Sequence, residues 1–596
     1  HLTLSADTTY TSLSGYSSIN LSSYIMTVNL SSDETYANVI SGSGGIIKTG
    51  SATLTLTGTN TYTGSTTITA GTLSISDSDH LGATPGSVDA DNIIFNGGTL
   101  LTTASFTLGT NKGITMTGNG TISTNTSTTL TYGGVVTGSS NLTKAGAGTL
   151  LMSGTNTYTG DTTISAGTLK LTGALSTSTD LVIGSSGTLD LQATQSFATL
   201  DLDGAISRSA GSSALTISGA SNIGGNITTS GTQTYTGAVT LSGGDRTLQG
   251  STVNFVDTIT GTGSHDLTIT GALDLDGAMT QVVELTVTST SNLGANVTTS
   301  STQTYSGAVT LSAATITLTT TNADVTFGDT VDSDSGQTRN LTIDTNGTTG
   351  TIQFGGMVGN TVGLGAITIT GNLDLDANIV DAASLSVSGT SNLGANVTTT
   401  GNQTYTGAVT LSSNVTLTTT SNGAVYFGST VDGGYTLGIT ANGTGDTTFV
   451  GAIGGTTALG DITIDTNDLT AAAITAGNLN VTHSGTGSIT GIIANASELD
   501  TLALIKAGAG TLTLSGVNTY TGNTTISNGD VVISGTAKLG GGSYSGNIAI
   551  ASGSTLSYAS SANQTLSGVI SGDGDVEKVT STTSTLTLSG TNTYTG

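Results

Sequence analysis

The heptapeptide GTNTYTG occupies residues 58–64, 154–160 and 590–596, and a near copy, GVNTYTG, occupies residues 516–522. Three of the copies continue into similar text: STTITAGTLSIS, DTTISAGTLKLTG and NTTISNGDVVISG. Thr, Ile and Leu favour strands in this text, and Gly and Asn favour turns. Self-similarity of this kind is typical of a solenoid, in which each repeat packs on the next. The recurring unit therefore predicts a structural scaffold.

The composition favours a β structure with a thin hydrophobic core over a globular domain with a large one. Of the 596 residues, 4% are aromatic and 8% are charged, with 88 Gly and one Pro. Low-complexity disorder is the alternative. Against it, 35% of residues are hydrophobic, and aliphatic residues alternate with polar ones, as at 53–56 and 512–514. No apolar stripe occurs at helical spacing, so we expect an all-β fold with almost no helix.

A second repeat type fills the middle of the chain. SNIGGNITTSGTQTYTGAVTLS begins at Ser221, and close copies begin at Ser291 and Ser391. The text therefore divides the chain into three zones, 1–203, 204–498 and 499–596, the last ending in mid-repeat. We expect all three to form one continuous solenoid, with coils of roughly 20 residues.

A lysine precedes the heptapeptide tyrosine at a fixed distance. Lys48 and Tyr62 are 14 residues apart, as are Lys144 and Tyr158, and Lys506 and Tyr520. In the final copy Lys578 and Tyr594 are 16 residues apart. The difference predicts a small loop insertion there.

Charge and missing residue types exclude several functions. The net charge is −27, from 37 acidic and 10 basic residues, whereas nucleic acid binding needs clustered cations. No Cys is present, which excludes disulfides and thiol catalysis. No apolar stretch approaches the roughly 20 residues that span a bilayer. Because the chain opens at His1 without a leader and stops in mid-repeat, we expect it to be a piece of a longer protein.

The repeats resemble a known family. KAGAGTLLMSGTNTYTGDTTISAGTLKL, at 144–171, closely resembles the autotransporter-associated β-strand repeat of autotransporter passenger domains, and KAGAGTLTLSGVNTYTGNTTISNG, at 506–529, resembles it again. QTYTGAVTLS and the FGSTVDG at 427–433 are similar to filamentous haemagglutinin-like giant exoproteins. These resemblances imply a right-handed, single-stranded parallel β-helix, an elongated rod. They also imply an extracellular location, at the surface of a Gram-negative bacterium.

The Asn, the Tyr and the last Gly of each heptapeptide are predicted to be structural. Asn can bond from turn to turn, and Tyr is expected to pack at a corner rather than to serve as a ligand platform. The residues are Asn60, Tyr62, Gly64, Asn156, Tyr158, Gly160, Asn518, Tyr520, Gly522, Asn592, Tyr594 and Gly596.

Three pairs of aspartates are weak candidates for Ca²⁺ binding. Residues two apart on a strand share a face, and carboxylates are preferred Ca²⁺ ligands. A solvated outer face is the favoured alternative, because the Gly-rich nonapeptide of Ca²⁺-binding β-helices is missing. The candidates are Asp201, Asp203, Asp274, Asp276, Asp374 and Asp376.

The sequence predicts no catalytic residue, no cofactor and no other metal site. The four histidines share no spacing that suggests a metal or a triad, and we expect them at the surface. The Asn-X-Thr sites at Asn141, Asn226, Asn296 and Asn396 are expected from chance in a chain so rich in Thr. No P-loop, nucleophile elbow or dinucleotide motif occurs.

These observations predict a non-enzymatic structural or adhesin protein. It would form a shaft or fibre for attachment, cell contact or biofilm matrix. Expected partners are further copies of the chain, in end-to-end or lateral filaments, and a host or neighbouring cell surface or its glycans. We expect no nucleic acid partner, and membrane contact only through a translocator or anchor outside this sequence. The alternatives are a β-helix polysaccharide lyase or hydrolase, and a Ca²⁺-stabilised matrix or surface-layer protein.

Overall fold

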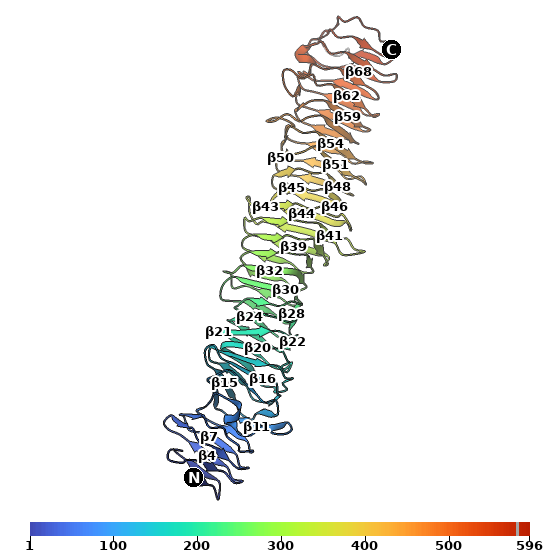
Figure 1. Ribbon diagram of the computed structural model, residues 1–596. Coiled ribbons are helices and arrows are strands. Elements are labelled where there is room, and N and C mark those ends of the chain that lie inside the picture. Colours follow the sequence, from blue (N-terminus) through green and yellow to red (C-terminus); the bar gives the residue numbers. More distant parts are fainter. Residues whose placement is uncertain (580–582) are drawn as a thin grey trace. The chain divides into compact units, whose positions relative to one another are not determined.

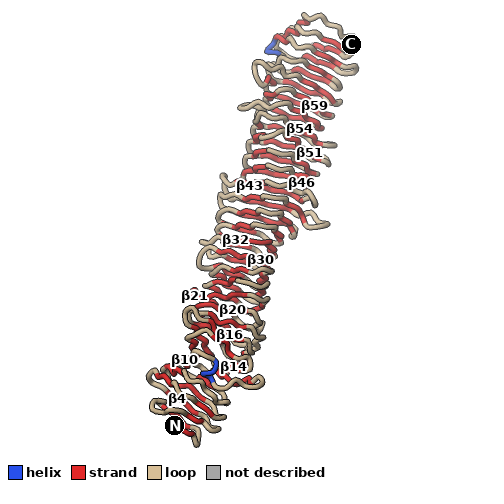
Figure 2. The backbone as a smooth tube through the Cα atoms, viewed as in Figure 1, coloured by secondary structure: helices blue, strands red, loops and turns tan. Residues whose placement is uncertain are grey.

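Short parallel strands are the main regular element of the computed structural model, which describes residues 1–579 and 583–596. The chain divides into two units, His1–Thr288 and Ser289–Gly596. Figure 2 shows short strands joined by loops in both. The described residues contain only two short 3₁₀ helices, η1 (Ser78–Leu81) and η2 (Gly540–Gly542). The expectation of an almost helix-free fold is confirmed.

In the second unit three strands complete one coil. β51 (Val415–Thr419), β52 (Val425–Phe427) and β53 (Val431–Asp432) follow one another along the chain. The next strands, β54 (Leu437–Ala441) and β55 (Thr447–Phe449), pair in parallel with β51 and β52. Figure 1 labels β51 and β54, which belong to successive coils. Each coil therefore lies directly on the previous one.

The first unit has the same construction. β25 (Leu215–Ile217), β26 (Ser221–Ile223) and β27 (Ile227–Thr228) form one coil. They pair in parallel with β28 (Gln233–Tyr235), β29 (Val239–Leu241) and β30 (Arg246–Phe255). The predicted parallel β-solenoid is confirmed in both units.

Hydrogen bonds between equivalent turns measure the coil length. Such bonds join residues 18, 20 and 22 positions apart in three successive coils of the second unit. The predicted coil of roughly 20 residues is confirmed.

The division into three zones of repeat type stays a prediction. The insertion predicted between Lys578 and Tyr594 involves residues 580–582, which lie outside the described part of the chain.

The core is a thin column of aliphatic side chains. Along β32 (Leu267–Leu275), Leu273 and Leu275 are 1% and 0% exposed, whereas Asp274 and Asp276 lie on the outer side. This inward-outward alternation follows from the period of two in a strand. Each coil contributes a few such residues, which explains how so few large side chains suffice.

Threonine hydroxyls bond to neighbouring coils, either through each other or through backbone carbonyls. The Oγ1 atoms of Thr115 and Thr137 are 2.9 Å apart, and Thr447 donates to Thr466 at 3.1 Å. More of these hydroxyls donate to carbonyl oxygens, as Thr69 does to Lys48 at 2.9 Å. A carbonyl has two lone pairs, so it can accept this bond in addition to its ladder bond.

Asparagine and aspartate side chains tie successive turns together. The Oδ1 atoms of Asn141, Asn226 and Asn296 accept hydrogen bonds from backbone N–H groups one coil later, at 2.8–2.9 Å. Asp432 accepts in the same way from Thr456 at 2.7 Å. The Asn-X-Thr sequences thus have a structural use, and some of the acidic residues satisfy turn amides.

Candidate functional site

The heptapeptide forms a corner in which the buried asparagine and tyrosine side chains have hydrogen-bond partners. Asn156 is 2% exposed, and its Oδ1 accepts from the Val136 N–H of the previous coil at 3.0 Å. Tyr158 is buried, and its hydroxyl lies 2.6 Å from Thr162 Oγ1. Burial raises the pKa of Tyr158, so the hydroxyl keeps its proton.

The other copies repeat this geometry. Asn60 accepts from Ile40 N–H at 2.8 Å and Asn518 from Ile493 N–H at 3.0 Å. The hydroxyls of Tyr62 and Tyr520 lie 2.7 and 2.8 Å from a threonine hydroxyl four residues later. In the final copy Asn592 accepts from Ile570 N–H at 2.9 Å, while Tyr594 is half-buried.

Glycine at the end of the heptapeptide permits close stacking of the coils. A Cβ on Gly160 would overlap the backbone of Ser140, and Gly64, Gly522 and Gly596 are equally close to the coil before them. A side chain at these positions would force the turns apart. The corner geometry accounts for the recurrence of Asn, Tyr and Gly without invoking a ligand.

Buried lysines are a feature of these repeats that sequence reasoning missed. Lys144 is 1% exposed, and its Nζ donates to the carbonyls of Ala145, Gly146 and Ala166 at 2.6, 2.8 and 3.1 Å. Gly146 has a φ of 71°, which L side chains rarely adopt. Burial lowers the pKa of Lys144 to about 8.

Equivalent carbonyls receive the other two repeat lysines. Lys506 donates to Ala507, Gly508 and Asn528, and Lys48 to Thr49, Gly50 and Ala70. The signal in the sequence is a lysine two residues before a glycine, with a further glycine 23 residues after the lysine. The lysine therefore satisfies turn carbonyls from inside the solenoid.

In the middle repeats a buried glutamine provides hydrogen-bond partners for the tyrosine hydroxyl and for a carbonyl of the next coil. Gln303 is buried, and its Nε2 donates to the Thr319 carbonyl of the next coil at 2.9 Å, while its Oε1 accepts from the Tyr305 hydroxyl at 3.1 Å. The Tyr305 ring stacks on Phe327, with centroids 5.5 Å apart, and Phe327 stacks on Phe354 at 5.2 Å. Gln403, Tyr405 and Phe427 repeat the arrangement.

The candidate aspartates face amides rather than each other. Asp201 accepts from Asn222 at 2.8 Å, Asp374 from Asn392 at 2.8 Å and Asp376 from Gln353 at 2.9 Å. Asp274 stands beside Asn254 in the ladder, and Asp203 and Asp276 are exposed. Within residues 1–579 and 583–596 no group of three or more His, Cys, Asp or Glu could hold a metal ion. Calcium binding at these pairs stays a prediction.

The expected surface position is wrong for three of the four histidines. His80, His265 and His483 are 7%, 8% and 0% exposed. His483 ends β59 (Leu479–His483) beside the inward-facing Thr466. Burial, followed by the charge of Lys506, lowers its pKa to about 4. An alternating pattern carries any residue inward at the right register, which a search for metal or triad spacings does not detect.

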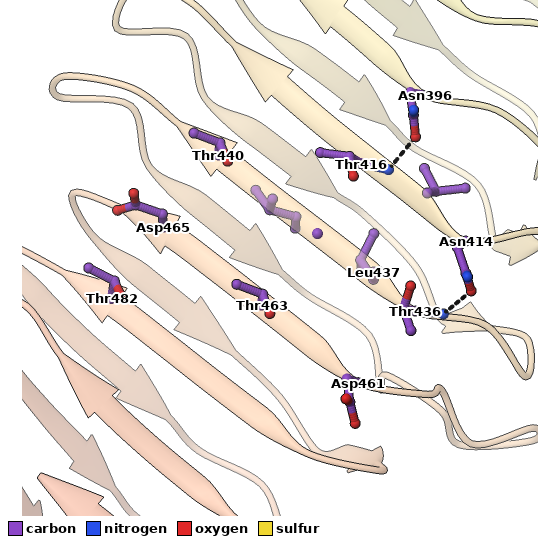
Figure 3. A pocket seen from close by; sticks show the side chains of 13 residues that line it. Asn396, Asn414, Thr416, Thr436, Leu437, Thr440, Asp461, Thr463, Asp465 and Thr482 are labelled. Atoms are coloured by element: carbon purple, nitrogen blue, oxygen red, sulfur yellow. Dashed lines mark hydrogen bonds between the residues drawn. The ribbon is translucent and has the colours of Figure 1, made fainter.

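The second unit has an open hollow on the outer face of one sheet (Figure 3). It spans β51, β54, β56 (Ile462–Thr466) and β59, and its volume is about 710 Å³. A smaller hollow of about 300 Å³ adjoins it and shares Asn396 and Asn414 with it. We call the two together the Asn–Thr groove. Sequence reasoning missed it, because its residues come from several coils.

Gly438 deepens the Asn–Thr groove. In the ladder Thr416 stands beside Gly438, and Gly438 beside Thr463, so a column of outward side chains is interrupted at one coil. In the next outward column Thr440, Asp465 and Thr482 are consecutive neighbours. The groove is thus walled by hydroxyls, amides and carboxylates.

Comparison with known proteins agrees with the repeat type. Four segments, at residues 46–75, 142–171, 504–533 and 583–596, match the passenger-associated transport repeat family. The chain is 34% identical over 137 residues to the adhesin BmaC autotransporter of Brucella suis biovar 1 (strain 1330). That match covers 23% of this chain and 4% of the adhesin's length. No solved structure gives a significant match.

The chain therefore carries the β-strand repeats of autotransporter passenger domains. The first three matched segments contain Lys48, Lys144 and Lys506 with their heptapeptides, so the family pattern coincides with the corner and the buried lysine described above. Among the described residues, no helix is long and apolar enough to cross a membrane. The likeness of the middle zone to haemagglutinin-like exoproteins stays a prediction.

Proposed function

We propose that this chain is a non-enzymatic adhesin segment displayed at the surface of a Gram-negative bacterium. The observation that carries the proposal is the set of passenger-associated transport repeats, each built into a solenoid corner. The relative named as an autotransporter adhesin supports the same role. The coils would hold a binding surface away from the cell, and the partner would be a host or neighbouring cell surface.

The spacing of Asp461 and Asp465 in the Asn–Thr groove supports a binding role over hydrolysis. Asp461 and Asp465 are four residues apart on one extended segment, which places their α carbons about 13 Å from each other. Inverting glycosidases hold their two carboxyl groups about 6.5–9.5 Å apart, and retaining enzymes hold them closer. The polysaccharide-cleaving alternative therefore lacks a suitable pair within this strand.

Surface display and adhesion can be tested on whole cells. Antibody labelling of intact cells should detect the chain, external protease should remove it, and deleting its coding region should reduce attachment to host cells. Undiminished attachment after deletion would contradict the adhesin role.

Release of reducing ends from polysaccharides by the purified chain would favour the enzyme, and a melting temperature raised by Ca²⁺ would favour the calcium-stabilised matrix protein. Filament formation stays a prediction, to be checked by electron microscopy of native material.

A further inference from the structure

We propose that the Asn–Thr groove binds a neutral polysaccharide whose chain crosses successive coils of the second unit. The inference rests on the proposed adhesin function and names the ligand class for it. The groove extends over consecutive turns, since Asn378, Asn396 and Asn414 line it one coil apart. Neighbouring strands lie about 4.8 Å apart, a spacing comparable to the size of one pyranose ring.

The asparagines are held in a fixed orientation. The Oδ1 atom of Asn378 accepts from Asn396 N–H at 2.9 Å, that of Asn396 from Thr416 N–H at 2.7 Å, and that of Asn414 from Thr436 N–H at 3.0 Å. Figure 3 shows the last two of these bonds. All three side chains are exposed, and their Nδ2 groups donate to no residue in the described part of the chain. A row of preoriented donors therefore remains for a ligand.

Acceptors and hydroxyls stand beside these donors. Asp461, just before β56, accepts from Asn478 through Oδ1 at 2.8 Å, and Asp465 is exposed on β56. Thr440, Thr463 and Thr482 add hydroxyls, which can donate or accept. Alternating donors and acceptors suit the hydroxyls of a sugar, because each sugar hydroxyl can both donate and accept.

Charge selects the class of polysaccharide. The residues that line the two hollows include Asp376, Asp461 and Asp465 but no Lys or Arg, in a chain of net charge −27. A uronate, sulfate or phosphate group would meet carboxylates without a compensating cation. Met357, 44% exposed, lines one end and offers an apolar surface to the C–H face of a ring. A neutral, polyhydroxylated chain fits these features.

Affinity electrophoresis of the purified chain tests the proposal. The probes are mannan, galactomannan, xyloglucan and dextran, with heparin and polygalacturonate as anionic counterparts. We expect at least one neutral polymer to retard the protein and both anionic polymers to leave it unaffected. Retardation by an anionic polymer alone, or by none of the six, would overturn the inference. Polysaccharide from the producing bacterium's own surface, run alongside, distinguishes coating of the same cell from attachment to another; either source supports the groove.

Matched variants locate the binding. Thr440→Lys places a long cation in the groove, whereas Thr448→Lys makes the same change at an outward position of β55, outside the residues that line the groove. T440K should weaken retardation at least tenfold and T448K should not. Asp465→Asn, at an exposed carboxylate, should weaken it about threefold without affecting the fold. Equal binding by all three variants and the wild type would refute this site.

The adhesin role and the groove can fail separately. If T440K retains wild-type retardation while attachment still depends on the chain, the groove is refuted and the adhesin role stays intact. Cells whose attachment does not depend on the chain at all would refute the adhesin role, whatever the electrophoresis shows. Loss of both polysaccharide retardation and attachment in T440K, with circular dichroism unchanged, would support both.

Discussion

The coils that carry the heptapeptide and the coils of the middle zone solve the same problem with different side chains. Both bury a tyrosine in the thin core. In the former, threonine and asparagine satisfy the corner and a lysine satisfies three carbonyls. In the latter, glutamine satisfies both the tyrosine and the next coil, and aromatic rings stack. The difference shows that buried polar groups need partners, but that the chemical nature of the partner is free to vary.

Removing a stacked ring should have the largest effect. Phe327 is 0% exposed and lies between Tyr305 and Phe354, so Phe327→Ala leaves a cavity between two rings and should cost about 3–5 kcal/mol. Amide hydrogen exchange in the coils around residue 327 would measure the loss locally. Tyr426→Ala is the control, because Tyr426 is 38% exposed and should lose far less. Equal losses would show that the stack is not what stabilises these coils.

Replacing a buried lysine should rank next. Lys144→Met keeps most of the volume but leaves the carbonyls of Ala145, Gly146 and Ala166 without this donor, at a cost of about 3 kcal/mol. Hydrogen exchange near residues 142–171 should accelerate accordingly. Lys170→Met serves as the control, because the Lys170 side chain is 32% exposed and its ion-pair contact, to Asp190, is long at 3.9 Å. If K144M proved as stable as K170M, the carbonyl contacts would contribute little.

Acid should destabilise the middle-zone coil that contains His483 more than the coils that carry the heptapeptide. Its pKa in the folded chain is about 4, below the ordinary value of about 6.5. On acidification the unfolded chain therefore binds the proton at a higher pH than the folded chain does. The stabilisation of the folded chain by neutral His483 is complete above about pH 6.5 and is lost as the pH falls toward 4. We expect a loss of about 3 kcal/mol, which His483→Gln should remove. Melting temperatures of both proteins between pH 7 and 4 test this. Parallel decreases in the two would mean that other groups carry the acid sensitivity.

The smallest effect should come from the tyrosine hydroxyls, and it should be similar in both kinds of coil. Tyr158→Phe removes the bond to Thr162, and Tyr305→Phe removes the bond to Gln303. Each change should cost about 1 kcal/mol. Thermal melting of the single variants would measure it. A much larger loss in Y305F would show that the glutamine depends on the hydroxyl for its orientation.

Part of this structure could be predicted because it depends on local pattern. The alternation in residues 273–276 placed Leu inward and Asp outward, as found. The heptapeptide marked a recurring structural unit, and such repeats predicted a solenoid with coils of roughly 20 residues. The alternation with a period of two and the repeated segments are written directly in the sequence.

Other features arise only when coils are stacked. Lys144 reaches a carbonyl 22 residues away, and its burial could not follow from a side chain that is usually exposed. His483 is buried by the register of its strand with β56.

The sequence by itself determined the all-β solenoid and the repeat type, because the repeats and the short-range alternation are local properties of the chain. Only the tertiary structure decided which polar residues lie inside and where the outer face is hollow. The Asn–Thr groove depends on Asn396, Gly438 and Asp465 meeting across separate coils. The physical reason is that a solenoid brings residues about twenty positions apart within hydrogen-bonding distance, and loops of varying length decide which ones meet.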